Sequence, residues 1–431
     1  MNRGGSREAG AMIPEQQDPS SCDKSETVVY VVYFHGELRV PINPCHSDID
    51  DDQVPDTMSI YTIHALHVED DSSHSHRPLP PPVLTLRPHD LPQLMGFGCL
   101  GSSIYMIGGR WDVPSSNRGP SLDVYILDTH RLPSTEYPPG NRNSLAYLRK
   151  GPKLNAPKIL PIVIALLGKL YVLPESFDPS YNKEHHPGAC IEVLDPDSNE
   201  WAALPEPILD PHDFSTPHDY NVQSFDVVES CIVLTLVRGL VYVLDGNHPF
   251  EGWKKSSRLD WLPVLHANWR TGGSEVVDGL WYPWFGFPSY HHGASYLVAY
   301  DLAQEKGEAE IIPVRRPRHG KGIRKIYSGQ RRVMDCGGGK AAIFSGGPSK
   351  WVDLTTYGYG NLRFNLDVVR LEKKITAGKS RKRKLGNLKA YSSINCVPLR
   401  SFSYDFGDVG RGGYLCACFA INEMSRNHRG N

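Results

Sequence analysis

Cys99-Leu-Gly-Ser-Ser-Ile-Tyr-Met-Ile-Gly-Gly109 is a glycine-bearing turn that leads into a short apolar strand and ends in a glycine pair. A second apolar run, Val124-Tyr-Ile-Leu-Asp128, follows it and ends in an aspartate. Short runs of β-branched and aromatic residues bounded by turn residues are typical of β-strands. The two runs predict a small antiparallel unit, and the rest of the chain can be compared with it.

The glycine-bearing turn recurs downstream. It reads Leu167-Gly-Lys-Leu-Tyr-Val-Leu173, with looser copies over 228–234 and 277–282. The last copy, Cys336-Gly-Gly-Gly-Lys-Ala-Ala-Ile-Phe-Ser-Gly-Gly347, again ends in a glycine pair. Glycine tolerates positive φ and lets neighbouring backbones approach closely, so we expect the paired glycines where inner strands crowd. These glycines are Gly108, Gly109, Gly346 and Gly347.

The strand that ends in aspartate also recurs, and its final residues are Asp128, Asp195, Asp245 and Asp301. These positions are separated by 67, 50 and 56 residues, and periods near 50 suit a four-stranded β-propeller blade. We expect each aspartate to accept hydrogen bonds from amides of the following turn. Trp201 and Trp253 follow two of the copies, and we expect them to fill the wedge between adjacent blades.

These residues resemble the kelch-repeat family, including its divergent plant members. The resemblance rests on the two glycine pairs, on the aromatic Tyr105, and on the step from Asp195 to Trp201 that precedes Leu204-Pro205. It covers roughly residues 27–370 and is clearest over 95–135. It implies an all-β, kelch-type β-propeller of four-stranded antiparallel sheets, with six blades expected and seven as the alternative.

The chain organisation follows from this fold. We expect a disordered leader over 1–26, a propeller over 27–422 and a flexible tail over 423–431. A basic loop is expected as an insertion over 373–390. The strands over 395–422, which include Ser401–Phe406 and Tyr414–Ile421, are expected to complete the first blade, so that the ring has no open edge. The expected blades span 27–66, 95–150, 157–205, 222–262, 272–314 and 330–371.

Composition restricts the possible classes of protein. A chain of 431 residues with 40 glycines and 35 prolines exceeds one ordinary hydrophobic core and suits a repetitive β architecture. Its formal net charge of −2 argues against a general polyanion binder. The nine cysteines lack the spacing of a disulfide framework, so we expect a cytoplasmic or nuclear protein. No signal peptide or apolar run of membrane-spanning length is visible.

Enzymes that resemble this architecture provide two tests for a metal site. Galactose oxidase binds copper with tyrosines and histidines and has a cysteine crosslinked to a tyrosine, and no segment here reproduces that motif. Plant specifier proteins of the kelch type carry iron on Glu, Asp and His residues spaced four apart. Glu206 and Asp210 match the first two positions, but the third is Phe214, which cannot ligate a metal.

Other polar motifs have simpler interpretations. His185-His186 and His291-His292 are interpreted as surface pairs, because successive strand residues point to opposite faces. Cys336-Gly-Gly-Gly-Lys340 lacks the spacing of a phosphate loop and is interpreted as a β-turn. We therefore assign no catalytic residue, no cofactor and no metal.

Two segments are candidates for contact with a partner. The stretch Trp281–Tyr290 is dense in aromatic residues, and part of it must pack inside a blade. Its prolines limit strand pairing, so we expect Phe287, Tyr290 and His291 in a loop on one rim, with core packing as the alternative. Arg110 and Trp111 emerge just after the first glycine pair. Exposed aromatic residues and arginines are frequent hot spots of protein interfaces.

A compact basic run, Lys379-Ser-Arg-Lys-Arg-Lys384, is of the nuclear-import type. The alternative is a solvated charge run in an exposed loop. Contact with nucleic acid is less expected, because no aromatic residue lies between the cations. The candidate import residues are Lys379, Arg381, Lys382, Arg383 and Lys384.

The sequence thus favours a monomeric, non-catalytic protein–protein interaction scaffold or adaptor, whose rim loops bind a protein partner. The alternative is an enzyme, or a metal-dependent activity of the specifier type, at the mouth of the axial channel. Many kelch relatives present substrates to ubiquitin ligases through an F-box or BTB domain. Because the strand pattern begins near residue 28, we expect neither of these domains in this chain.

Overall fold

The computed structural model describes sixteen segments of the chain. In the described residues no helix is long and apolar enough to cross a bilayer. The segments are 26–35, 60–68, 80–87, 90–111, 119–132, 144–179, 191–237, 240–256, 275–277, 280–282, 298–301, 312–315, 330–348, 362–375, 392–405 and 414–423.

Four sheets contain four antiparallel strands each, and we call each of them a blade. Blade 1 orders as β24 (Tyr414–Glu423), β1 (Glu26–His35), β2 (Ile60–Val68) and β3 (Leu84–Leu86). Blade 2 contains β4 (Gly96–Leu100), β5 (Ser103–Ile107), β6 (Val124–Asp128) and β7 (Leu148–Lys150). Blade 3 contains β8 (Ile162–Leu166), β9 (Lys169–Leu173), β10 (Ile191–Asp195) and β11 (Glu200–Leu204). Blade 4 contains β12 (Val222–Val228), β13 (Cys231–Leu236), β14 (Val241–Asp245) and β15 (Lys254–Lys255).

The fifth sheet has eight strands and consists of two antiparallel halves. One half, blade 5, contains β16 (Glu275–Val277), β17 (Leu280–Tyr282), β18 (Val298–Asp301) and β19 (Ile312–Arg315). The other half, blade 6, contains β20 (Gln330–Gly337), β21 (Lys340–Pro348), β22 (Leu362–Ile375) and β23 (Ser392–Asp405). A short parallel pairing of β19 with β23 joins the halves. The all-β propeller prediction is confirmed, with five hydrogen-bonded sheets rather than six separate ones.

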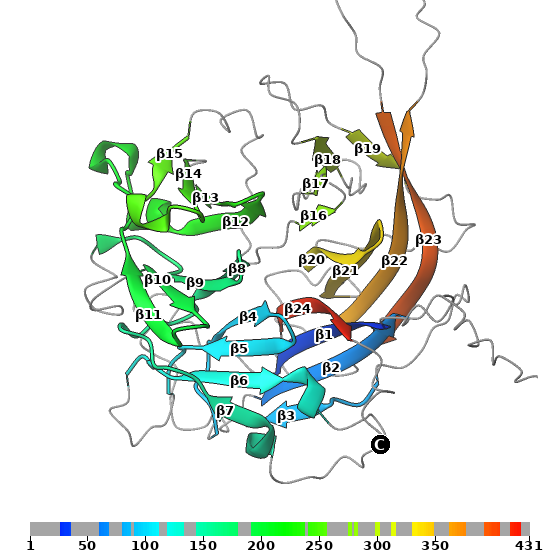
Figure 1. Cartoon of the computed structure of the whole chain (residues 1–431), viewed down its shortest axis with the longest axis horizontal. Helices are drawn as coiled ribbons and strands as arrows, with labels where there is room; N and C mark the ends of the chain where they lie inside the picture. Colours follow the sequence, from blue (N-terminus) through cyan, green and yellow to red (C-terminus); the bar gives the residue numbers. More distant parts are fainter. Residues whose placement is uncertain are drawn as a thin grey trace, which may run out of the picture.

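The six strand groups surround a common centre (Figure 1). The first strand of each blade lies nearest to that centre, and these strands contact one another at five of the six boundaries between blades. β24 contacts β4, β4 contacts β8, β12 contacts β16, β16 contacts β20, and β20 contacts β24. Blades 3 and 4 share one hydrophobic cluster that includes Tyr171, Ile232 and Trp253. The arrangement is therefore a ring rather than two unlike lobes.

The core lies between blades, because alternate side chains of a strand face opposite neighbours. In β6, Tyr125 and Leu127 belong to the cluster shared with blade 1. Val124 and Ile126 belong to the cluster shared with blade 3. Trp201 joins this second cluster and is 9% exposed. It fills the wedge between blades 2 and 3, the place that the sequence pattern predicts for it.

The ends of the described chain meet in blade 1. β24 pairs antiparallel with β1 from Glu26↔Glu423 to Phe34↔Tyr414. The prediction that Ser401–Phe406 also completes blade 1 is wrong for its described residues, because β23 pairs with β22 in blade 6. β22 continues to Ile375, so the start of the expected 373–390 insertion is a strand. The expected leader and tail lie outside the described residues, apart from Glu26 and the strand end Glu423.

The two glycine pairs differ in structure. Gly108 has φ 67° and Gly109 has φ 90°, and a Cβ on Gly108 would lie 2.5 Å from the carbonyl oxygen of Lys158. Gly346 and Gly347 lie inside β21, where they pair with Phe364 and Arg363. Only the first pair therefore closes its strand with left-handed backbone. The triple glycine, which begins with the last residue of β20 and leads into β21, forms the predicted turn, with positive φ at Gly337, Gly338 and Gly339.

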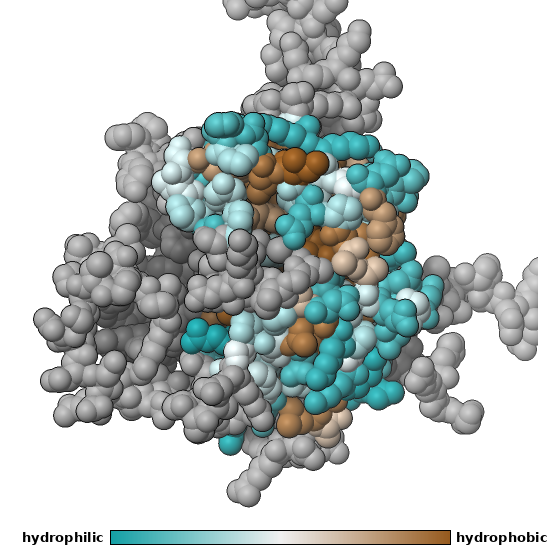
Figure 2. Space-filling view, turned by 90° about the vertical axis from the view of Figure 1, so that its left-hand side faces the viewer, coloured by the Kyte–Doolittle hydropathy of each residue, from teal (hydrophilic) through white to brown (hydrophobic). Residues whose placement is uncertain are grey.

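The outer surface of blades 3 and 4 mixes apolar and polar areas. Figure 2 shows this side of the molecule, where apolar patches lie between hydrophilic ones. Ile208 and Phe250 are exposed here by 90% and 64%. They lie in the segments after β11 and β14, and these segments approach each other, because a Cβ on Gly252 would lie 3.4 Å from Cβ of Pro205.

Candidate functional site

The aspartates at the strand ends hold the turns that follow them. The Asp128 carboxylate accepts from the His130 amide at 3.1 Å, and the Asp195 carboxylate accepts from the Asp197 amide at 3.1 Å. The Asp245 carboxylate accepts from the Asn247 amide at 2.9 Å. The side chain of Asp301 lies outside the described side chains. These aspartates therefore have a structural role, which is to hold the backbone of the turn after each strand.

Arg110 and Trp111 extend the β5–β6 hairpin beyond the glycine pair. Arg110 exchanges backbone hydrogen bonds with Gln93 at 2.7 and 2.8 Å and also bridges to Pro120. Arg110 is exposed and Trp111 is half-buried. The first partner-contact candidate thus lies on a short, hydrogen-bonded extension of blade 2.

The other candidate residues lie outside the described residues or side chains. They are Phe287, Tyr290 and His291, together with the basic residues Lys379, Arg381, Lys382, Arg383 and Lys384. Their roles stay predictions. Only Arg110 and Trp111 can be placed in the structure.

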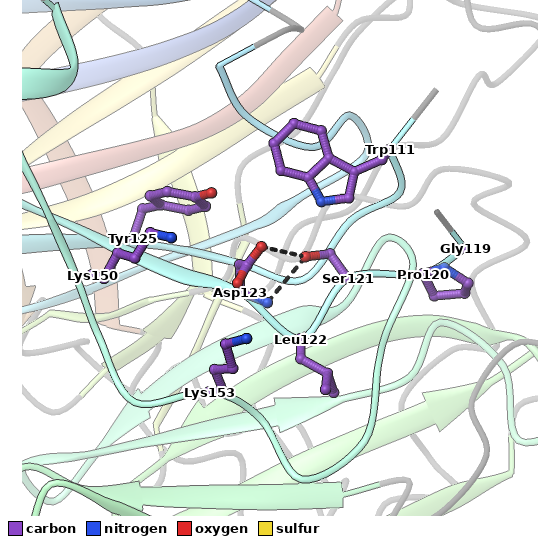
Figure 3. Close-up of a pocket in the computed structure, with 9 residues that line it drawn as sticks. All are labelled: Trp111, Gly119, Pro120, Ser121, Leu122, Asp123, Tyr125, Lys150 and Lys153. Atoms are coloured by element: carbon purple, nitrogen blue, oxygen red, sulfur yellow. Dashed lines mark hydrogen bonds between the residues drawn. The ribbon is translucent and has the colours of Figure 1, made fainter. Parts of the chain in front are cut away.

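A cavity of about 480 Å³ opens beside Trp111 (Figure 3). Trp111 lies on one side of the polar pair formed by Asp123 and Ser121, and Lys153 lies on the other. Tyr125 forms a further wall next to Lys150. The cavity joins the β5–β6 loop to the linker between blades 2 and 3. The lining residues are Trp111, Gly119, Pro120, Ser121, Leu122, Asp123, Tyr125, Lys150 and Lys153.

Asp123 and Ser121 form a closed polar pair in this cavity. The Ser121 hydroxyl donates to the Asp123 carboxylate at 3.2 Å, and the Asp123 amide donates back to the Ser121 hydroxyl oxygen at 3.0 Å. The Ser121 amide donates to the Gly109 carbonyl at 2.7 Å. Burial, and then the nearby Asp123 carboxylate, raise the pKa of Tyr125 to about 12. Tyr125 is therefore a neutral phenol at physiological pH.

The opposite wall is cationic. Lys150 ends β7 and Lys153 lies in the linker that follows, and both side chains are exposed. Neither lysine has an ion-pair partner among the described residues. Two free ammonium groups beside one carboxylate, which already accepts from a hydroxyl, give the cavity a positive edge.

A buried ion pair fixes the linker that carries Lys153. The Lys158 ammonium contacts the Glu192 carboxylate of β10, and both side chains are fully buried. The same carboxylate accepts from the amides of Asn155 at 2.7 Å and Ala156 at 3.1 Å. The Lys158 carbonyl accepts from the Gly109 amide at 2.7 Å. One buried acid therefore organises the linker, which in turn supports the glycine pair.

Glu206 and Asp210, which match two of the three ligand positions of the specifier-type iron site, have other surroundings in the structure. No group of three His, Cys, Asp or Glu side chains in the described part of the chain could hold a metal ion. Glu206 and Asp210 are exposed, and the Asp210 carboxylate accepts from the His212 amide at 3.0 Å. Asp210 thus caps the short 3-10 turn Pro211–Asp213.

Sequence reasoning missed the cavity walls Tyr125, Lys150 and Lys153. It also missed the buried pair, although the sequence carries a signal for it. Three residues before the terminal aspartate, β6 has Tyr125 and β14 has Tyr242, whereas β10 has Glu192. An acidic residue at a position that is aromatic in two of the other three copies and Val298 in the third, with apolar residues on either side, indicates a buried partner.

Comparisons with known proteins agree with the fold. A family model described as "Protein of unknown function (DUF1668)" matches residues 49–319, which is more than half of the chain. An F-box/kelch-repeat protein of Arabidopsis thaliana is 28% identical over 147 residues, or 34% of this chain. The match spans only 35% of that relative's own length.

Two solved structures show weaker likeness. The structure of YjhT aligns with a TM-score of 0.34 at 11% identity, covering 73% of this chain and 89% of that one. The N-terminal domain of Nup159 aligns with a TM-score of 0.30 at 8% identity, covering 72% of this chain and 62% of that one. The kelch-type resemblance therefore rests on the sequence relative and on the strand arrangement itself.

Proposed function

We propose that this chain, which belongs to the DUF1668 family, is a non-catalytic protein-interaction scaffold. The partner binds at the loops around the Trp111 cavity. Those loops are the β5–β6 loop and the linker between blades 2 and 3.

One observation carries this proposal. A cavity of about 480 Å³ lies at the Trp111 loop, and its walls combine aromatic, apolar and charged side chains. Cavities of this size that mix apolar walls with a few polar groups suit recognition. Backbone hydrogen bonds hold Arg110 and Ser121 on either side of the cavity, and the buried Glu192 holds the linker, so these described residues lose little conformational entropy when a partner binds.

The sequence relative supports the same direction. Its name joins a kelch-repeat region to an F-box. We propose that the present chain shares the recognition role of a kelch-repeat region and acts as an adaptor. The partner's identity and any link to a ligase belong to this proposal.

The test compares partners captured in cells. Proximity labelling with the full chain is expected to enrich a protein set that Trp111→Ala loses. Phe250→Ala is the matched control, because it removes an aromatic side chain that is 64% exposed in blade 4. The enriched proteins are then purified and titrated against the wild-type chain and the two variants. A set that Trp111→Ala leaves unchanged contradicts the proposal.

The basic run over 379–384 supports a second proposal, nuclear import. β22 and β23 pair as far as Ile375↔Ser392, and the basic run lies in the sequence that connects these two residues. Replacing its five cations with glutamine is expected to abolish nuclear accumulation of a tagged chain. Exchanging Lys and Arg within the run keeps the charge and is expected to preserve it. A wild-type chain that stays in the cytoplasm contradicts this proposal.

A further inference from the structure

We infer that the Trp111 cavity recognises a peptide segment with an aspartate or glutamate next to an apolar side chain. This inference rests on the proposed function and specifies the chemistry of the partner. The acidic side chain pairs with Lys150 and Lys153, and the apolar one packs against Trp111 and Tyr125.

The charge of the cavity favours an acidic segment. Lys150 and Lys153 are both exposed, with no ion-pair partner among the described residues. Asp123, the one carboxylate among the described lining residues, already accepts a hydrogen bond from the Ser121 hydroxyl at 3.2 Å. An incoming carboxylate therefore meets two cations that form no ion pair with any other described residue.

The remaining walls of the cavity explain why we expect an apolar residue next to the acidic one in the bound peptide. Trp111 provides a large half-buried ring, Tyr125 is 7% exposed, and Pro120 and Leu122 complete the apolar lining. Tyr125 is a neutral phenol at physiological pH, as an ordinary tyrosine is, and burial raises its pKa further, so its ring adds no negative charge that would repel an acidic peptide. Large aromatic side chains of this kind anchor interfaces.

The buried Glu192 supports the cationic wall indirectly. Lys153 lies two residues before Asn155, and the Asn155 amide donates to Glu192 at 2.7 Å. The Asn155 side chain also donates to the Trp201 carbonyl at 3.0 Å. These two hydrogen bonds fix the linker backbone next to Lys153. The Lys153 side chain therefore extends into the cavity from a backbone of fixed position.

The experiment selects binders from a display library of random 12-residue peptides on the full chain. Wild-type protein is expected to enrich peptides with Asp or Glu next to an aromatic or aliphatic residue. In synthetic copies of the selected peptides, Asp→Asn or Glu→Gln is expected to weaken binding about tenfold, and added salt is expected to weaken it further. Enrichment of neutral or basic peptides, or no enrichment, overturns the inference.

Charge reversal locates the contact. Lys150→Glu/Lys153→Glu is expected to lower affinity for the selected peptides about tenfold or more. Arg131→Glu/Lys254→Glu is the matched control, because these side chains are exposed by 72% and 74% outside the cavity. Affinity that the cavity variant leaves unchanged overturns the inference.

The two proposals fail separately. If the cellular partner set depends on Trp111 while the peptides show no acidic preference, this inference falls and the proposed function stands. If peptides bind but no cellular partner depends on Trp111, the proposed function falls.

Discussion

At Gly108, backbone conformation and close contact act on the same residue. Its φ of 67° lies in the left-handed region, and a Cβ there would lie 2.5 Å from the Lys158 carbonyl oxygen. Gly168 has a similar φ of 73°, but a Cβ there would meet nothing within 4 Å. The pair separates the conformational effect from the steric one.

Gly168→Ala is expected to lower the free energy of unfolding by about 1–2 kcal/mol, the usual cost of left-handed backbone in a residue with a side chain. Gly108→Ala is expected to lower it by roughly 3 kcal/mol or more, because the linker carbonyl must also move. Urea denaturation followed by tryptophan fluorescence measures both. Equal losses in the two variants would mean that the contact with Lys158 contributes nothing.

His64 gives blade 1 a pH dependence. Its side chain is 5% exposed, and its ring nitrogens contact the Pro80 carbonyl at 2.9 Å and the Thr62 hydroxyl at 3.2 Å. Burial lowers the pKa of His64 below its ordinary value of 6.5. Below pH 6.5 the unfolded chain takes up this proton first, so the native state loses stability as pH falls.

The wild-type chain is therefore expected to lose more stability between pH 7.5 and pH 5.5 than His64→Gln does. Unfolding midpoints in urea at the two pH values give the comparison, and the difference between the proteins removes the contribution of the other titrating groups. Parallel losses in the two proteins would show that His64 does not titrate differently in the native state.

The sequence predicts residue roles well where the cause is local. The aspartates at strand ends bond to amides two residues ahead, which needs only the neighbouring chain. The cavity could not be predicted in this way, because Trp111, Tyr125 and Lys153 come from separate segments that only the folded blade brings together.

At the scale of elements, the linker between blades 2 and 3 depends on a buried pair. Lys158→Met removes the cation and leaves the Glu192 carboxylate buried and without its ionic partner. Breaking a buried pair from one side typically lowers stability by about 3–5 kcal/mol, and we expect a loss in this range. The variant Lys158→Met/Glu192→Gln is expected to recover part of it, because the remaining amide is neutral and its oxygen still accepts from a linker amide.

Lys169→Met provides the control for this prediction. Lys169 contacts Asp195 at 2.9 Å, but both side chains are about two-fifths exposed. Exposed pairs contribute little to stability, so the control is expected to unfold close to the wild-type midpoint. Thermal and urea unfolding of the four proteins settle the comparison. A Lys158→Met midpoint equal to that of the control would contradict the structural role of the pair.

Strand alternation predicts elements but not always their partners. The pattern located the strands of blades 2, 3 and 4, whose members are consecutive in sequence. It misplaced β23 because β22 and β23 pair over a long hairpin across a segment that carries no strand pattern. The parallel contact of β19 with β23 is likewise set by the neighbouring blade and leaves no signal in either strand.

At the scale of the whole molecule, the ring closes through β24. This strand pairs with β1, and it adds Ala417 and Ile421 to the core between blades 1 and 2. It also adds Cys418 to the core between blades 6 and 1. β24 therefore contributes to two interblade cores at once, and without it the edge of β1 toward the centre would lose its hydrogen-bonding partner.

Ending the chain after Gly413 removes β24 and is expected to lower stability by several kcal/mol, since each large buried apolar side chain contributes about 1.5–3 kcal/mol. Ending it after Glu423 keeps the full β1–β24 pairing and is the matched control. Differential scanning calorimetry is expected to give a lower or absent transition for the shorter chain and an unchanged one for the control. A cooperative transition at the same temperature in the two truncated proteins would mean that the ring stays closed without β24. In that case the stability of the propeller would lie in the contacts between the remaining inner strands.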